Sequence, residues 1–108
     1  MINYKEIFKL KDMLTNANID HIFYNRPENG GYQICYPDNG ADRICSVILH
    51  NYSYGNEKGL LEIMGLLTDD EYEYDTVKGY LTAEEVFKRI KEDWDNRKEN
   101  VVLWIKGI

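Results

Sequence analysis

The segment Ile44–Leu67 constrains the fold more than any other part of the chain. Two apolar runs, ICSVILH and LLEIMGLL, flank the polar loop NYSYGNEKG, a pattern that predicts a β-hairpin with a long tip. A strand that is apolar on both sides must be covered on both sides, so we expect this hairpin to lie at the centre of the fold. Apolar residues of the second run occupy both parities of a strand: Leu60, Met64 and Leu66 on one, and Leu61, Ile63 and Leu67 on the other.

Length and charge limit the class of protein. A chain of 108 residues can form one hydrophobic core, so we expect a single domain over residues 1–108. No apolar run is as long as a membrane span and charges interrupt the N-terminal segment, which predicts a cytoplasmic protein with no membrane partner. The net charge of −6, from 13 basic and 19 acidic residues, argues against non-specific nucleic-acid binding. It favours a basic protein partner, or mimicry of a nucleic acid.

Helix signals lie near both ends of the chain. Asn3 and Glu6 form a capping pair ahead of apolar residues at helical spacing, which predicts a helix over Asn3–Ala17. The motif TAEE at 82–85 is a capping box before a second apolar stripe and predicts a helix over Ala83–Asn96. The terminal run VVLWIKGI follows the polar break NRKEN and predicts an edge strand over residues 101–108.

Strand signals fill the middle of the chain. The runs HIFYNR and YQICYP, separated by PENGG, predict a first hairpin, and a turn over Pro37–Asp42 joins it to the central one. We therefore expect an α+β fold, an antiparallel sheet of four to five strands with two helices on one face. The predicted order of elements is α-β-β-β-β-α-(β).

The turn centres set an expected register. A turn centred near Gly40 pairs Cys35 with Cys45, and a loop centred within NYSYGNEKG pairs Ile48 with Glu62. A slip of one residue in either hairpin would exchange the faces. The face under the helices is then Cys35, Cys45, Val47, Leu49, Leu61, Ile63 and Leu67, with Gln33. The second face is Tyr32, Ile34, Tyr36, Ile44, Ser46, Ile48, His50, Glu62 and Met64.

The second face combines aromatic, aliphatic and polar side chains, as recognition surfaces do. We expect it to be covered by residues 101–108, buried in a homodimer, or left for a partner. Its candidate partner-binding residues are Tyr32, Tyr36, His50, Glu62 and Met64.

The residues with catalytic or metal-binding chemistry give no clear site. Cys35 and Cys45 lie on the opposite face from His50 in this register, so no single zinc ion reaches them all, and we expect free thiols and no metal. Ser46, His50 and Glu62 share a face but lack a predicted pocket and oxyanion donors. We found no hydrolase, zinc-protease or phosphate-loop motif. We therefore expect a protein that is not an enzyme and has no cofactor.

Two polar segments are candidate binding elements. The run TDDEYEYD is predicted to be a solvated loop, and its carboxylates could be offered to a basic protein surface. These carboxylates are Asp69, Asp70, Glu71, Glu73 and Asp75. The loop HNYSYGNEKG could instead stack a nucleobase and hold a phosphate through backbone N–H groups, or simply pack on its own domain. Its candidate ligand-binding residues are Tyr52, Tyr54, Gly55 and Lys58.

At HNYSYGNEKGLLEIMGLL and GYLTAEEVFKRI, the chain resembles small uncharacterised proteins carried by phages and prophages of low-GC Gram-positive bacteria. The likeness covers roughly residues 20–95. It implies a protein that acts in the host bacterial cytoplasm and inhibits a host defence protein, as anti-CRISPR proteins do. The alternatives are a sponge for a small cyclic or ADP-ribose-type nucleotide at a dimer interface, and a structural or assembly protein.

Overall fold

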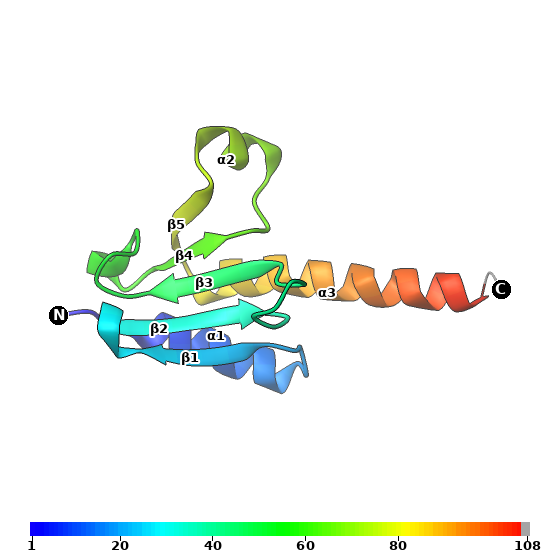
Figure 1. Ribbon diagram of the computed structural model, residues 1–108, viewed down its shortest axis with the longest axis horizontal. Coiled ribbons are helices and arrows are strands. Elements are labelled where there is room, and N and C mark those ends of the chain that lie inside the picture. The colour runs from blue at the N-terminus through cyan, green and yellow to red at the C-terminus, as the bar shows by residue number, and fades with distance from the viewer. Residues whose placement is uncertain (107–108) are drawn as a thin grey trace.

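The computed structural model describes the backbone of residues 1–106 and the side chains of residues 1–97. Five antiparallel strands form one sheet in the order β1-β2-β3-β4-β5, and α1 and α3 pack together on one of its faces (Figure 1). The expected α+β class, with both helices on one face of an antiparallel sheet, is confirmed. The helices are α1 (Lys5–Asn16), α2 (Asp69–Tyr74) and α3 (Ala83–Lys106). The strands are β1 (Ile22–Arg26), β2 (Gly31–Tyr36), β3 (Cys45–Leu49), β4 (Leu61–Met64) and β5 (Val77–Leu81), and short 3-10 turns occupy Pro27–Asn29 and Asn56–Lys58.

The starts of the two long helices follow their local signals in different ways. The predicted capping box before α3 is confirmed, because Thr82 Oγ1 accepts from Glu85 N at 3.2 Å while Glu85 Oε1 accepts from Thr82 N at 3.1 Å. At α1, Asn3 Oδ1 accepts from Lys5 N, but Glu6 does not complete a box. Its Oε1 instead accepts from Ala83 N at 2.8 Å, which holds the first turn of α3 against α1.

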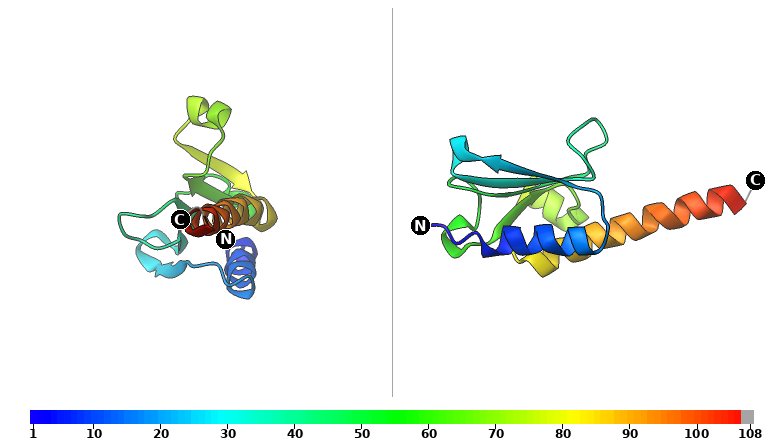
Figure 2. Two further views of the ribbon diagram at one scale, coloured as in Figure 1. Left: turned by 90° about the vertical axis from the view of Figure 1, so that its right-hand side faces the viewer. Right: turned by 90° about the horizontal axis from the view of Figure 1, so that it is seen from below.

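The C-terminal prediction was wrong. Residues 101–106, expected as an edge strand, continue α3 to Lys106, and the last two residues of that prediction lie outside the described ones. The polar segment NRKEN contains neither glycine nor proline, so nothing in it ends a helix. In Figures 1 and 2, the second half of α3 extends past the end of the sheet.

The segment after β4 also differs from its prediction. The acidic run is the short helix α2 rather than a loop, and β5 follows it as an edge strand that was not predicted. A second capping box begins α2: Glu71 N donates to Thr68 Oγ1 at 3.2 Å, and Thr68 N donates to Glu71 Oε1 at 2.9 Å. In β5, Lys78 and Gly79 interrupt the apolar residues of VKGYL, so the sequence shows neither an apolar run nor a strict alternation.

The register of β2 against β3 is shifted by one residue from the expected one. Tyr36 pairs with Cys45 and Cys35 pairs with Ser46, whereas the β3–β4 pairing of Ile48 with Glu62 is as predicted. The shift places Ile34 and Tyr36 under the helices instead of Gln33 and Cys35, so larger apolar side chains enter the core. The core consists of Ile7, Leu10, Leu14, Ile34, Tyr36, Val47, Leu49, Leu61, Ile63, Val86 and Ile90, with smaller contributors around them.

The two cysteines consequently lie on opposite faces of the sheet. The expectation that Cys35 and Cys45 stand directly across from each other is wrong, and their side chains cannot meet to form a disulfide. Both are free and buried. Burial raises the pKa of the Cys45 thiol to about 12 and also raises the pKa of Cys35.

No helix or strand in the described part of the chain covers the face of the sheet away from the helices, which we call the open face, although Cys35 and Ser46 on it are buried (Figure 2). Of the three arrangements expected for this face, cover by the C-terminal run is not seen in the described residues, because these continue α3. A polar band crosses the open face: Arg26 Nε donates to Gln33 Oε1 at 2.9 Å, and Gln33 Nε2 donates to Ser46 Oγ at 2.8 Å. Met64 on the same face is 49% exposed. Within the described residues, no helix has the length and apolar character needed to cross a membrane.

Candidate functional site

The segment Thr68–Thr76, which we call the acidic arm, stands off the β5 edge of the sheet (Figure 1). A turn leads into the arm and an irregular strand follows it. After β4, Gly65 and Leu66 both adopt left-handed backbone conformations, with φ of 95° and 56°. Beyond the arm, Tyr80 within β5 adopts φ of 60°, where the register of β5 against β4 shifts. Such angles are unfavourable for leucine and tyrosine, so the surrounding structure must hold both residues in place.

Arg89 of α3 fastens the base of the arm. Its Nη1 and Nη2 donate to the two carboxylate oxygens of Glu71 at 2.6 and 2.8 Å, and Nη1 also donates to Leu66 O at 3.0 Å. A forked pair of this kind fixes both position and orientation. The Arg89 guanidinium lowers the pKa of the Glu71 carboxyl to about 2.

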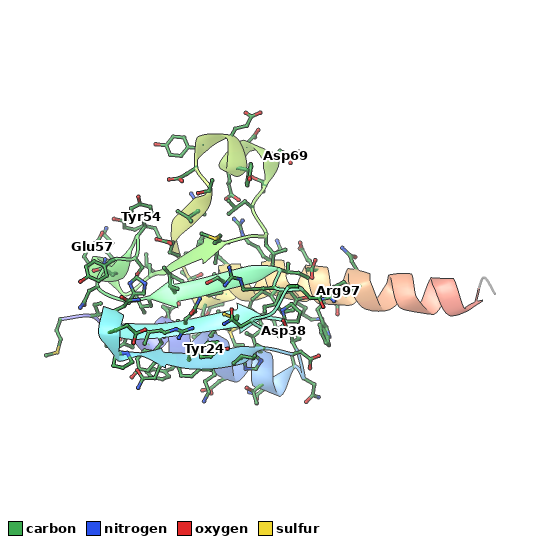
Figure 3. All side chains as sticks on the ribbon, in the orientation of Figure 1. Tyr24, Asp38, Tyr54, Glu57, Asp69 and Arg97 are labelled. Carbon is green, nitrogen blue, oxygen red and sulfur yellow. The ribbon has the colours of Figure 1, made fainter. Side chains whose placement is uncertain are left out.

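The other acidic side chains of the arm face solvent. Among the described residues, Arg89 is the only cation that forms a salt bridge with the arm. Tyr72 and Tyr74 add two aromatic rings that are 65% and 93% exposed. Figure 3 shows Asp69 on the arm, well separated from the rest of the fold. The exposed carboxylates are Asp69, Asp70, Glu73 and Asp75.

Of the five predicted acidic residues, the structure therefore brings four together as exposed groups. The fifth, Glu71, pairs with Arg89 within the domain, a contact that we call the clamp. Sequence reasoning did not identify Arg89, Tyr72 or Tyr74. The motif T-D-D-E at 68–71 has the same form as the capping box at 82–85, so the helix itself could have been predicted.

The residues predicted for the second face of the sheet do not all lie on that face. Tyr32 and Tyr36 lie on the helix-covered side of the sheet, so their assignment to the second face was wrong. Tyr36 is fully buried and its hydroxyl donates to Asp93 Oδ2 at 2.6 Å. Tyr32 packs in an aromatic cluster, with ring centroids 4.8 Å from Phe8 and 5.4 Å from Phe23. Neither tyrosine is available to a partner on the open face.

The three side chains considered as an acid–base set, Ser46, His50 and Glu62, form hydrogen bonds within the domain. His50 is buried and its Nδ1 accepts from Tyr52 N at 3.1 Å, while Glu62 Oε1 accepts from Tyr54 N at 2.9 Å. Ser46 Oγ accepts from the Gln33 amide. These contacts shape the loop after β3 and the polar band. In the described part of the chain, no group of three His, Cys, Asp or Glu side chains could hold a metal ion.

The loop between β3 and β4 exposes its tyrosines, whereas its glycines allow close packing within the domain. Tyr52 is 74% exposed and Tyr54 is 55% exposed. A Cβ on Gly55 would lie 2.9 Å from Tyr80 N, so this glycine makes room for the neighbouring strand of its own domain. Lys58 is exposed, and Glu57 beside it accepts a hydrogen bond from the Tyr80 hydroxyl. Figure 3 places Tyr54 and Glu57 together at this end of the sheet.

Comparison with known proteins adds no relative from which a function could be transferred. No family model, no curated protein and no solved structure matches this chain.

Proposed function

We propose that the protein is a non-catalytic binding protein that offers its acidic arm to a basic surface of a partner protein. The observation that carries the proposal is the clamp between Arg89 and Glu71, which holds the arm away from the sheet, while no cation among the described side chains forms a salt bridge with its other carboxylates. Electrostatic complementarity of this kind accelerates association and suppresses wrong partners. The exposed rings of Tyr72 and Tyr74 supply the aromatic contacts that dominate many protein interfaces.

The partner that fits best is a protein whose basic surface binds nucleic acid. Carboxylates spaced along a projecting helix can occupy the positions of phosphates, and tyrosine rings can replace stacked bases. Together with the resemblance to small phage proteins, this favours inhibition of a nucleic-acid-binding host defence protein in the bacterial cytoplasm.

The proposal is tested with two variants of equal charge. The arm variant carries Asp69→Asn, Asp70→Asn and Glu73→Gln, and leaves Glu71 in its clamp. The control variant carries Asp12→Asn, Glu28→Gln and Asp42→Asn, at exposed positions on other elements. Each full-length protein is used as bait in a lysate of a Gram-positive host, and captured proteins are eluted with increasing salt.

We expect the original chain and the control variant to retain the same salt-sensitive partner, and the arm variant to lose it, because exposed charges act through a screened field. Capture of that partner by all three proteins at the same salt concentration would show that the arm is not the binding element.

A nucleotide sponge is the second candidate, and the exposed rings of Tyr52 and Tyr54 favour it. A thermal-shift screen against cyclic and ADP-ribose-type nucleotides separates the two proposals, because a tight ligand raises the melting temperature. The sponge proposal requires that this shift disappear in a Tyr52→Ala, Tyr54→Ala variant. A structural or assembly protein would give neither salt-sensitive capture nor a nucleotide-dependent shift.

A further inference from the structure

An open hollow of about 510 Å³ lies between the acidic arm and the turn that follows β4. Leu66 and Leu67 are half-buried and pack against the hydrophobic core, so they give the hollow an apolar floor. The ring of Tyr72 lines one side. The residues lining the hollow are Gly65, Leu66, Leu67, Asp69, Tyr72 and Glu73.

Leu66 occupies this position against its backbone preference. Its φ of 56° is a conformation in which glycine or asparagine would be relaxed and leucine is strained. The Arg89 guanidinium holds the carbonyl of Leu66 at 3.0 Å and the adjoining Glu71 carboxylate, so the turn and the arm are fixed by the same side chain. The hollow is therefore built into the fold rather than opened by a loose loop.

The charge at the rim selects the kind of occupant. Asp69 and Glu73 line the hollow, and neither forms a salt bridge with a described residue. Phosphate groups of a nucleic acid or an anionic membrane would be repelled there. A second copy of this chain, with a net charge of −6, would meet the same repulsion. A cationic segment with an apolar side chain satisfies both the floor and the rim.

We propose that this hollow binds an apolar side chain from a basic segment of the partner protein, with a neighbouring lysine or arginine pairing with Asp69 or Glu73. The inference rests on the proposed function and names the chemistry of the partner segment. The apolar side chain acts as the buried anchor, and the carboxylates set its orientation, the usual division between the core and the rim of an interface.

Two synthetic peptides serve as probes, and binding is measured by calorimetry with the full-length chain. One is rich in lysine and carries leucines at helical spacing; in the other, of equal length and charge, serine replaces each leucine. We expect the leucine peptide to bind about tenfold more tightly, because anchoring apolar side chains carry much of the affinity of an interface.

The variant Leu66→Asn should abolish this preference, since asparagine tolerates the left-handed backbone but removes the apolar side chain. Tyr72→Ser changes an exposed ring of the same hollow and provides a second variant that leaves the core intact. Ile22→Ser is the matched control: its side chain is 37% exposed at the start of β1, outside the hollow, and the preference should persist.

Equal binding of the two peptides by the original chain, or a leucine preference that survives in both hollow variants, would overturn the inference. The arm variant with Asp69→Asn, Asp70→Asn and Glu73→Gln then separates the two proposals. If it binds both peptides more weakly than the original chain does, the acidic arm stands and only the hollow fails. If its affinity is unchanged, the proposed function fails as well.

Discussion

Arg89 and Glu71 are joined by two parallel hydrogen bonds of 2.6 and 2.8 Å, one to each carboxylate oxygen. The side chains are 23% and 20% exposed, so the pair is shielded from most of the solvent. It connects α3, which packs in the core, to an arm that has few other contacts with the domain. The position of the candidate binding surface therefore depends on this ion pair.

Removal of the clamp should loosen the arm. We expect Arg89→Ala to lower the free energy of unfolding by about 1–3 kcal/mol, because it leaves the Glu71 carboxylate and the Leu66 carbonyl without their donor. Urea denaturation measures this change, and limited proteolysis should show earlier cleavage within residues 65–80. The control is Lys91→Ala, which breaks an exposed pair with Asp95 and should cost about 0.5 kcal/mol or less. Equal effects of the two substitutions would contradict the role of the clamp.

Stability should depend on pH through Glu71. The pKa of its carboxyl is about 2 in the folded protein, below its ordinary value of 4.5, so the folded state binds fewer protons. The stabilisation is therefore fully present above pH 4.5 and is lost as the pH falls towards 2. Comparison with Glu71→Gln by urea denaturation across this range should show two stability curves that converge at low pH. A constant difference between them would exclude this linkage.

Tyr36 should stabilise the fold through its buried hydroxyl. Tyr36→Phe removes the hydrogen bond to Asp93 Oδ2 and should cost about 1–2 kcal/mol in chemical denaturation. Burial, with the Asp93 hydrogen bond, also raises the pKa of Tyr36 above its ordinary value of 10, so this phenol should stay protonated in an alkaline ultraviolet titration. Tyr74→Phe, at a side chain that is 93% exposed, should leave stability unchanged. If Tyr36→Phe left the free energy of unfolding unchanged, the result would instead support the register expected from the sequence, in which Tyr36 lies on the open face.

Gly65 should tolerate no side chain. A Cβ there would lie 2.0 Å from the carbonyl oxygen of Ile44, and its φ of 95° is unfavourable for other residues. Gly65→Ala should therefore lower the free energy of unfolding by more than about 2 kcal/mol. Gly40→Ala is the control, because the nearest atom, Asp38 Oδ1, is 3.4 Å from the added Cβ, and its effect should stay within about 1 kcal/mol. Thermal melting of both variants measures the difference.

Several features could be derived from the sequence because their causes lie within a few residues. The capping box at Thr82 and Glu85 begins α3, and the apolar stripes at the helical period give both long helices. The pairing of Ile48 with Glu62 follows from the length of one loop. The alternation of apolar runs and turns was enough to establish an antiparallel α+β fold.

Other features were decided by tertiary structure. The β2 register depends on whether Tyr36 or Cys35 fills the space under α3, and a slip of one residue inverts every side chain of the strand. The arm depends on Arg89, which lies 18 residues beyond Glu71 in the chain and meets it only when α3 packs on the sheet. Local patterns determine which segments become helices and strands, since those interactions span a few residues. Which side chains face a partner is determined by contacts between distant segments, and these exist only in the folded molecule.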